Sequence, residues 1–153
     1  NLAGNKVPFK DTYIKEKMSS RIQGSTNWQS NTLLMFKRAH KYFPLIEPIL
    51  KENGLPNDFK YLPLIESGLQ NVTSPAGAKG FWQIMDDTAK ENGLEVNSNG
   101  DERYHIEKAT QAACIYLKDA KERFGNLTLV AAAYNAGNRG VSGKMETQLV
   151  SSY

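Results

Sequence analysis

Cysteine and histidine are scarce in this sequence, whose 153 residues include one Cys and two His. One Cys cannot form an internal disulfide, and so few thiol and imidazole groups argue against a zinc site. We therefore expect neither a metal nor a cofactor. Cys114 lies in the apolar stretch 112–115, far in sequence from His40 and His105, so a buried structural thiol is favoured over a nucleophile.

Long apolar runs are also missing. No stretch approaches the ~20 apolar residues that a membrane-spanning helix needs, and residues 1–5 lack the basic and then apolar pattern of an export leader. Apolar residues make up 40% and charged residues 23% of the chain, as in ordinary soluble globular proteins. We expect a soluble monomer, with any export signal or lipid anchor removed or outside this chain.

Charge of neither sign dominates, but the two signs are unevenly distributed around the net charge of +3. Residues 1–51 contain nine Lys or Arg and three Asp or Glu, a balance of +6, whereas residues 52–153 contain ten and thirteen, a balance of −3. The basic part could attract a nucleic acid or an anionic envelope polymer. Its charges are spread over helical faces without a recognition motif, so we expect solvated helix faces and no nucleic-acid partner.

Convincing alternation of apolar and polar residues is absent, which predicts a mainly α fold with at most a small β-ribbon between Glu95 and Arg103. The clearest helix is Ile106–Phe124, because its apolar residues recur with the 3.6-residue period and Gly125 follows as a stop signal. Residues 127–133 carry no charge and predict a helix that is buried on most sides.

Prolines and glycines divide the first half of the chain into further helices. An amphipathic helix is expected over 11–23, and a second begins near Thr26 or Asn27 and runs toward Phe43. Pro44 either interrupts this second helix or starts the next one, since proline is tolerated in a first helical turn but not in a helix interior.

A shorter helix is expected to open at Asn57 or Asp58 and to end near Glu66. Pro63 should kink or break its last turns, because proline has no N–H and clashes with the preceding turn. Glu66 is the one charged residue over 62–78. Desolvation in such a stretch raises a carboxyl pKa toward the value that a general acid needs near neutral pH. The alternative is a structural Glu that caps or salt-bridges a helix end.

Residues 74–85, with the sequence SPAGAKGFWQIM, combine a turn, two glycines, two aromatic residues, an amide and a thioether. Glycines let a backbone approach a ligand closely, and aromatic faces and planar amides suit sugar rings and acetamido groups. Each of these features alone is a weak signal, because a lone Gln or Met on a helix usually belongs to the surface or the core.

In combination with Glu66–Ser67 and the downstream run 133–137, this pattern resembles the soluble-lytic-transglycosylase domain of the goose-type lysozyme superfamily. Within that superfamily it is most similar to the membrane-bound lytic murein transglycosylase D group. The resemblance covers about residues 32–141, and several motifs in the expected order are far more specific than one. These motifs are 62–67, 74–85, 101–103, 116–117 and 133–137.

The resemblance implies a lysozyme-like helical fold and a division of the chain. The catalytic domain is expected over 32–153, truncated at its C-terminus, after a helical extension over 1–31. Glu66 matches the family's single catalytic carboxylate, and Tyr134 is expected to orient it. The residues implied to bind the substrate are Ser67, Ser74, Gln83, Met85, Tyr134 and Asn135.

The residues themselves also suggest structural roles, both for part of this set and for nearby acidic residues. Tyr134 and Asn135 also fit a helix end, with Asn135 or Gly137 supplying a left-handed cap. Asp86 and Asp87 predict the cap and first turn of a short helix. Asp101 with Arg103 similarly predicts an ion pair that fixes a loop. No second catalytic carboxylate then remains beside Glu66, in contrast to ordinary glycosidases.

The implied function is that of a lytic transglycosylase acting on peptidoglycan glycan strands in the periplasm of the bacterial cell envelope. Its single Glu acts first as acid and then as base, cleaves the β-1,4 bond between N-acetylmuramic acid and N-acetylglucosamine, and leaves 1,6-anhydromuramic acid ends. The full-length protein is expected to be anchored in the outer membrane. The alternatives are a lysozyme-type hydrolase of the same bond and an inactive peptidoglycan-binding module.

Overall fold

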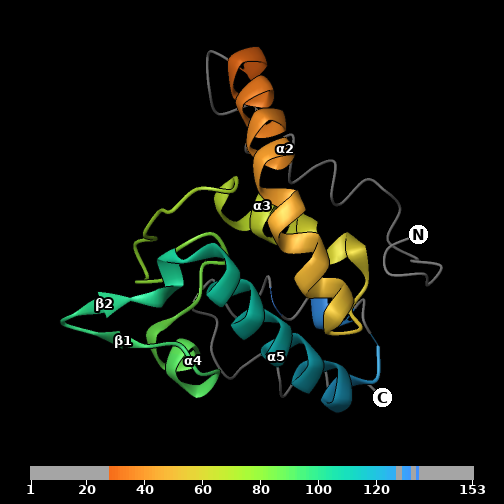
Figure 1. Ribbon diagram of the computed structural model, residues 1–153, viewed down its shortest axis with the longest axis vertical. Coiled ribbons are helices and arrows are strands. Elements are labelled where there is room, and N and C mark those ends of the chain that lie inside the picture. The colour runs from red at the N-terminus through yellow and green to blue at the C-terminus, as the bar shows by residue number, and fades with distance from the viewer. Residues whose placement is uncertain (1–27, 127–128, 132–133, 135–153) are drawn as a thin grey trace.

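The structure is a computed structural model that describes residues 28–126, 129–131 and 134. It is mostly helical with one two-stranded antiparallel sheet, which confirms the predicted fold class (Figure 1). The helix predicted over 11–23 lies outside the described residues, and the division at residue 31 stays a prediction. The elements in chain order are α2 (Trp28–Glu52), η1 (Asn57–Lys60), α3 (Tyr61–Ser67), α4 (Asp86–Glu91), β1 (Val96–Asn97), β2 (Gly100–Asp101), η2 (Glu102–Tyr104) and α5 (Ile106–Phe124).

Helix α2 continues through Pro44 and Pro48, so the expectation that Pro44 interrupts a helix or starts a new one is wrong. An interior proline costs about 3 kcal/mol through a lost hydrogen bond and a steric clash. Both prolines are exposed, so water can reach the outer face of the helix where these bonds are missing. The buried residues Ile46, Ile49 and Leu50 then hold the last turns of α2 in the core and offset the cost.

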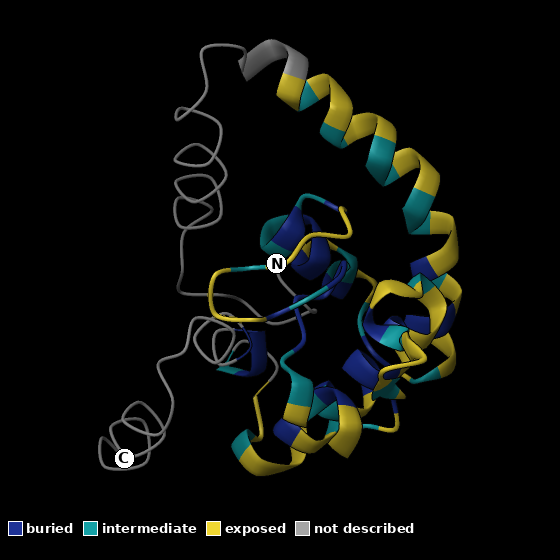
Figure 2. Cartoon of the chain, turned by 90° about the vertical axis from the view of Figure 1, so that its left-hand side faces the viewer, coloured by how far each residue is buried: buried dark blue, intermediate teal, exposed yellow. Residues whose placement is uncertain are grey.

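The first half of α2 stands apart from this core. No residue from 31 to 45 is buried, and Phe36 is 69% exposed. Figure 2 shows exposed residues along this part of the helix and buried ones near its end, where it reaches the body of the molecule. None of the described helices combines the length and the hydrophobicity of a membrane-spanning segment.

Helix α5 has the predicted bounds and supplies much of the core. It packs against α2 and ends at Gly125, whose φ of 64° is the left-handed conformation expected of a helix stop. Its buried residues are mostly small, so the neighbouring segments pack close to its axis. Cys114 is fully buried, as predicted, and desolvation raises the pKa of its thiol to about 11. At neutral pH this group therefore stays protonated and is a poor nucleophile.

The segment before Glu66 differs from the predicted single helix. Residues 57–60 form the 3-10 turn η1, and α3 begins only at Tyr61. Pro63 is therefore the third residue of α3, where a helix needs no N–H donor, and the predicted kink in the last turns is wrong. Gly68, with a φ of 63°, ends α3 one residue after Ser67.

The predicted β-ribbon is confirmed. Strands β1 and β2 pair with Val96 opposite Asp101 and Asn97 opposite Gly100.

Asp86 and Asp87 occupy the first turn of α4, as predicted, but the cap position belongs to Met85, which makes no side-chain capping bond. Neither Asp therefore caps α4, but the negative charge of both side chains stabilises the helix, because its N-terminal end is positively polarised.

Gly80 is fixed by a close backbone approach. Its φ is 79°, and a Cβ at this position would lie 2.0 Å from the carbonyl oxygen of Arg103. Real Cβ atoms are never this close to backbone oxygen, so the loop after α3 can lie against η2 only if residue 80 is glycine.

We predict that Gly80→Ala lowers the free energy of unfolding by about 3 kcal/mol or more, through left-handed strain plus the clash. Gly93→Ala is the matched control, because Gly93 has a φ of 86° but no atom within 4 Å of the added Cβ. Gly93→Ala should lower the free energy of unfolding by only about 1–2 kcal/mol. Urea denaturation measures both values, and equal losses would contradict the proposed clash.

Candidate functional site

The predicted site residues that the structure describes lie on α3, on the loop over 68–85 that follows it, and at Tyr134. Glu66 is half-buried in the last turn of α3. Leu62, Pro63 and Leu64 of the same helix are buried, so the carboxyl group stands at the border between the core and the surface.

Ser67 faces the interior. Its Oγ lies 2.9 Å from the carbonyl oxygen of Pro63 and 2.7 Å from that of Phe81, and it accepts a hydrogen bond from the N–H of Gln70. A hydroxyl has one proton and can donate to only one of these carbonyls at a time. Ser67 thus links the end of α3 to the loop, and this contact positions Glu66 relative to residues 80–85.

Gln83 is only 5% exposed and has a φ of 51°, in the left-handed region that residues other than glycine rarely adopt. Its Nε2 group donates to the carbonyl oxygens of Val72 and Gly80, both at 2.8 Å. These two bonds hold opposite arms of the loop together and stabilise the strained backbone. The amide protons of Gln83 are therefore used inside the protein.

Ser74 closes the turn at the tip of the loop. Its N–H donates to the carbonyl of Ala78 at 2.8 Å, and its Oγ accepts from the N–H of Ala78 at 3.0 Å. Beyond the turn, Lys79 pairs in antiparallel fashion with Thr73 on one side and Ile84 on the other. The loop is thus a small ordered sheet-like structure, with Ser74 half-buried at one end.

Met85 and Tyr134 come together at a cavity of about 100 Å³. The Tyr134 hydroxyl donates to the carbonyl of Trp82 at 2.7 Å, and its ring meets that of Tyr116 edge-on, with centroids 5.6 Å apart. The predicted role of Tyr134 in orienting Glu66 stays a prediction, and Asn135 lies outside the described residues. The cavity is lined by Ile84, Met85, Thr88, Asn92, Ala112, Ala113, Tyr116 and Tyr134.

Three polar lining residues, Thr88, Asn92 and Tyr116, were not predicted as site residues. Tyr116 falls on the apolar face of α5, and periodicity alone places it in the core. A signal was nevertheless present, because Ala112 and Ala113 precede Tyr116 by about one helical turn. Small residues beside an aromatic ring leave space that a ligand can enter.

Trp82 anchors the loop to α5. Its side chain is fully buried, and its Nε1 donates to Thr110 Oγ1 at 2.9 Å. The Thr110 hydroxyl donates in turn to the carbonyl of Ile106 at 2.6 Å, so both buried polar groups are satisfied.

The predicted ion pair between Asp101 and Arg103 is confirmed, and it stabilises the same loop. Arg103 is 3% exposed and binds both carboxylate oxygens of Asp101, at 2.8 and 2.7 Å. Its guanidinium also donates to the carbonyl of Ile84 at 3.3 Å and lies 3.5 Å from Asp86. These contacts with Arg103 lower the pKa of Asp101 to about 2.

Within the part of the chain that the structure describes, no three His, Cys, Asp or Glu residues gather in a way that could hold a metal ion.

Comparison with known proteins connects the chain with one family. A family model described as "Transglycosylase SLT domain" matches residues 43–149. Two curated relatives, from Escherichia coli strain K12 and from Escherichia coli O6:H1 strain CFT073, are each named "Membrane-bound lytic murein transglycosylase D". Each is 33% identical to this chain over 143 residues, which make up 92% of the chain and 30% of the relative. The chain thus spans less than a third of the length of these relatives.

Asp101 makes a testable contribution to stability. Because its pKa is lower in the folded protein than its usual 3.8, the pair stabilises the fold above about pH 4, and this stability is lost as the pH falls through 2. The shift corresponds to about 2 kcal/mol. We predict that Asp101→Asn lowers the free energy of unfolding by at least about this amount at pH 6, because the buried guanidinium of Arg103 loses the carboxylate of Asp101.

Denaturation curves at pH 6 and at several values between 4 and 2 measure this effect. The stability of Asp101→Asn should depend less on pH in that window than that of the parent. Asp119→Asn, on the exposed face of α5, is the control and should change stability by less than about 0.5 kcal/mol. An equal decline of the parent and Asp101→Asn below pH 4 would refute the assignment.

Proposed function

The chain belongs to the transglycosylase SLT domain family, and on that premise we propose that it cleaves the glycan strands of peptidoglycan. The bond cut is the β-1,4 linkage between N-acetylmuramic acid and N-acetylglucosamine. The observation that carries the proposal is the position of Glu66, half-buried at the end of α3 and tied through Ser67 to the loop that holds Gln83 and Met85.

Glu66 is the proposed acid and base. Its protonated carboxyl donates a proton to the glycosidic oxygen, the C1–O bond breaks, and the acetamido oxygen of the substrate stabilises the cationic C1. The resulting carboxylate then takes the proton from the 6-hydroxyl of the same sugar, whose oxygen bonds to C1. The products are a free 4-hydroxyl and a 1,6-anhydro end, and Glu66 regains its proton.

Ring closure by the 6-hydroxyl requires no water. A tethered nucleophile has a very high effective concentration, which favours this reaction over hydrolysis when the sugar is held in place. The proposed holding groups are Ser74, Met85 and Tyr134, together with Asn135, which lies outside the described residues. The ordered loop keeps these segments from moving apart before the substrate binds.

We further propose that the protein acts in the bacterial cell envelope, in the periplasm, as a monomeric catalytic domain of a longer protein anchored in the outer membrane. The support is the name of the two relatives, which describes them as membrane-bound murein enzymes.

Glu66→Gln should reduce cleavage of purified peptidoglycan by about 100-fold or more, because an amide cannot donate and recover the proton. Glu91→Gln, at an exposed position of α4, is the matched control and should keep the parent activity. Loss of turbidity in a suspension of purified sacculi measures both. Equal rates for Glu66→Gln and the parent would remove Glu66 from the mechanism.

The products separate ring closure from hydrolysis. Mass spectrometry of the released fragments should find muramic acid ends that are lighter by one water than hydrolysis products and that borohydride does not reduce. Reducible ends of full mass would instead identify a lysozyme-type hydrolase. Binding without any cleavage would identify a peptidoglycan-binding module.

A further inference from the structure

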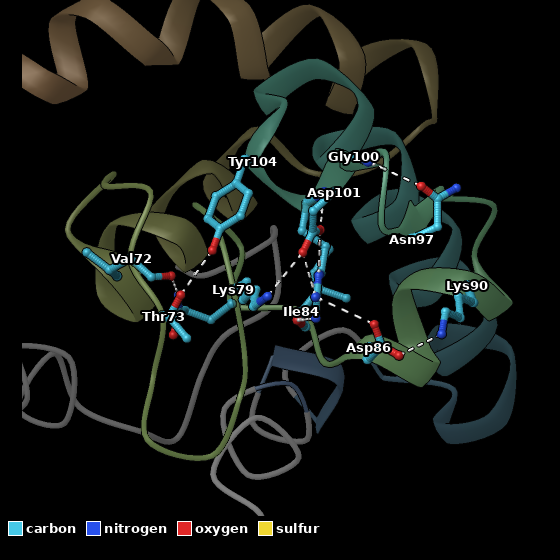
Figure 3. Close-up of polar contacts among 12 residues, drawn as sticks. Val72, Thr73, Lys79, Ile84, Asp86, Lys90, Asn97, Gly100, Asp101 and Tyr104 are labelled. Carbon is cyan, nitrogen blue, oxygen red and sulfur yellow. Dashed lines mark hydrogen bonds and ion pairs between the residues drawn. The ribbon is translucent and has the colours of Figure 1, made fainter.

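A second polar surface lies where the loop meets η2. It consists of Asn71, Thr73, Lys79 and Tyr104, and we call it the Lys79–Tyr104 surface. Figure 3 shows Thr73, Lys79 and Tyr104. The Lys79 side chain is 34% exposed and Tyr104 is 37% exposed, and Asn71 and Thr73 are exposed as well. An ammonium, a phenol ring, a hydroxyl and an amide are therefore presented to solvent side by side.

These side chains are held in position before any ligand binds. The Tyr104 hydroxyl lies 3.0 Å from Thr73 Oγ1, and its backbone carbonyl accepts from Asn71 Nδ2 at 2.9 Å. Lys79 is fixed through its backbone, which exchanges two hydrogen bonds of 3.1 Å with Ile84. A surface ordered in this way loses little conformational entropy when it binds.

The Lys79 ammonium shares its carboxylate partner, Asp101, with Arg103. Asp101 already binds Arg103 through both of its oxygens at 2.8 and 2.7 Å, and Lys79 reaches it only at 3.4 Å. Asp86 is paired with Lys90 at 2.7 Å on the far side of Arg103. Lys79 therefore holds the longer of the two contacts to a shared carboxylate, and its partly exposed ammonium stays accessible to a second one.

Lys79 also stands 6.0 Å from the centroid of the Tyr104 ring. This distance is at the limit of a cation–π contact, so the ring attracts the ammonium only weakly and does not neutralise its charge. The combination fits a ligand that carries a carboxylate next to an apolar group: the ammonium attracts the carboxylate, the Thr73 hydroxyl offers a hydrogen bond, and the ring packs against the apolar part.

We propose that the Lys79–Tyr104 surface binds a carboxylate of the peptide branch that the muramic acid of the substrate carries. This inference rests on the proposed function, since it assigns a second subsite for the same substrate. The glycan backbone of such a polymer is uncharged, and the acidic groups lie on its branches.

The surface is continuous with the candidate site. Lys79 stands between Ser74 and Gln83 on one loop, and Gln83 donates to the carbonyl of Gly80, the residue after Lys79. A carboxylate bound at Lys79 therefore fixes a sugar branch relative to the same loop that carries Ser74 and Gln83.

The test compares two forms of one probe, a disaccharide-peptide fragment of peptidoglycan with its carboxylates either free or converted to amides. Binding is measured by calorimetry on the intact protein, in the Glu66→Gln background so that the probe is not consumed. The protein should bind the free-acid form about fivefold more tightly than the amide, as a partly exposed charge-assisted contact provides.

Lys79→Met should abolish this preference, Lys79→Arg should retain it, and Lys90→Gln, which removes a cation from the opposite side of the network, should leave it unchanged. If Lys79→Met keeps the full preference, or if the protein never prefers the free acid, the inference is wrong. If Lys79→Met fails to fold, the preference is measured at rising salt in the protein that retains Lys79. The preference for the free acid should then decrease, because salt screens a charge contact, and a preference that salt does not change would contradict the inference.

The binding readout is independent of cleavage. Suppose that Lys79→Met abolishes the preference for the free acid, but the protein that retains Glu66 does not cleave peptidoglycan. This result would support the carboxylate subsite and overturn the proposed reaction. Cleavage by the parent without any preference for the free acid would do the reverse.

Discussion

Three backbone carbonyls in the loop after α3 carry the constraint on which the site depends. Each is buried and must find a donor, because an unpaired buried carbonyl costs about as much as a lost hydrogen bond. The sequence provides these donors as side chains from three separate segments of the chain. The pairs are Ser67 with Phe81, Tyr134 with Trp82, and Arg103 with Ile84.

This pattern explains why polar residues of the site are buried instead of lining an open groove. Ser67, Gln83 and Arg103 hold the main chain, and the loop in turn presents Ser74, Lys79 and Met85. A binding site on a loop is usually mobile, but here the loop contacts α3, α5 and η2 together. The consequence is an ordered loop that is linked through Ser67 to the end of α3, and such order suits the proposed reaction, whose rate depends on holding one sugar ring in place.

The sequence predicted the features that depend on neighbours along the chain. The period of α5, its stop at Gly125 and the ribbon next to Asp101 and Arg103 are all local signals, and the structure confirms them. Two proline predictions failed for a physical reason. The effect of Pro44 depends on whether water can reach the helix face, and that of Pro63 on where α3 begins, and neither is a property of the proline itself.

The contacts of the site were less predictable, because they join distant residues. Tyr134 and Trp82 are 52 positions apart and Trp82 and Thr110 are 28, so no spacing rule identifies them. Family resemblance pointed to Ser67 and Gln83 as substrate-binding residues. The structure adds what resemblance could not, namely that their polar atoms already bond the protein's own backbone.

The central claim is that this rigid loop holds a glycan strand against Glu66. The most direct measurement is a crystal structure of the Glu66→Gln protein with a bound peptidoglycan fragment. The account predicts that the glycosidic oxygen lies about 3 Å from the side chain at position 66, within hydrogen-bonding reach, with the sugar chain along residues 74–85. A fragment bound elsewhere on the molecule, with position 66 out of reach of any glycosidic oxygen, would contradict it.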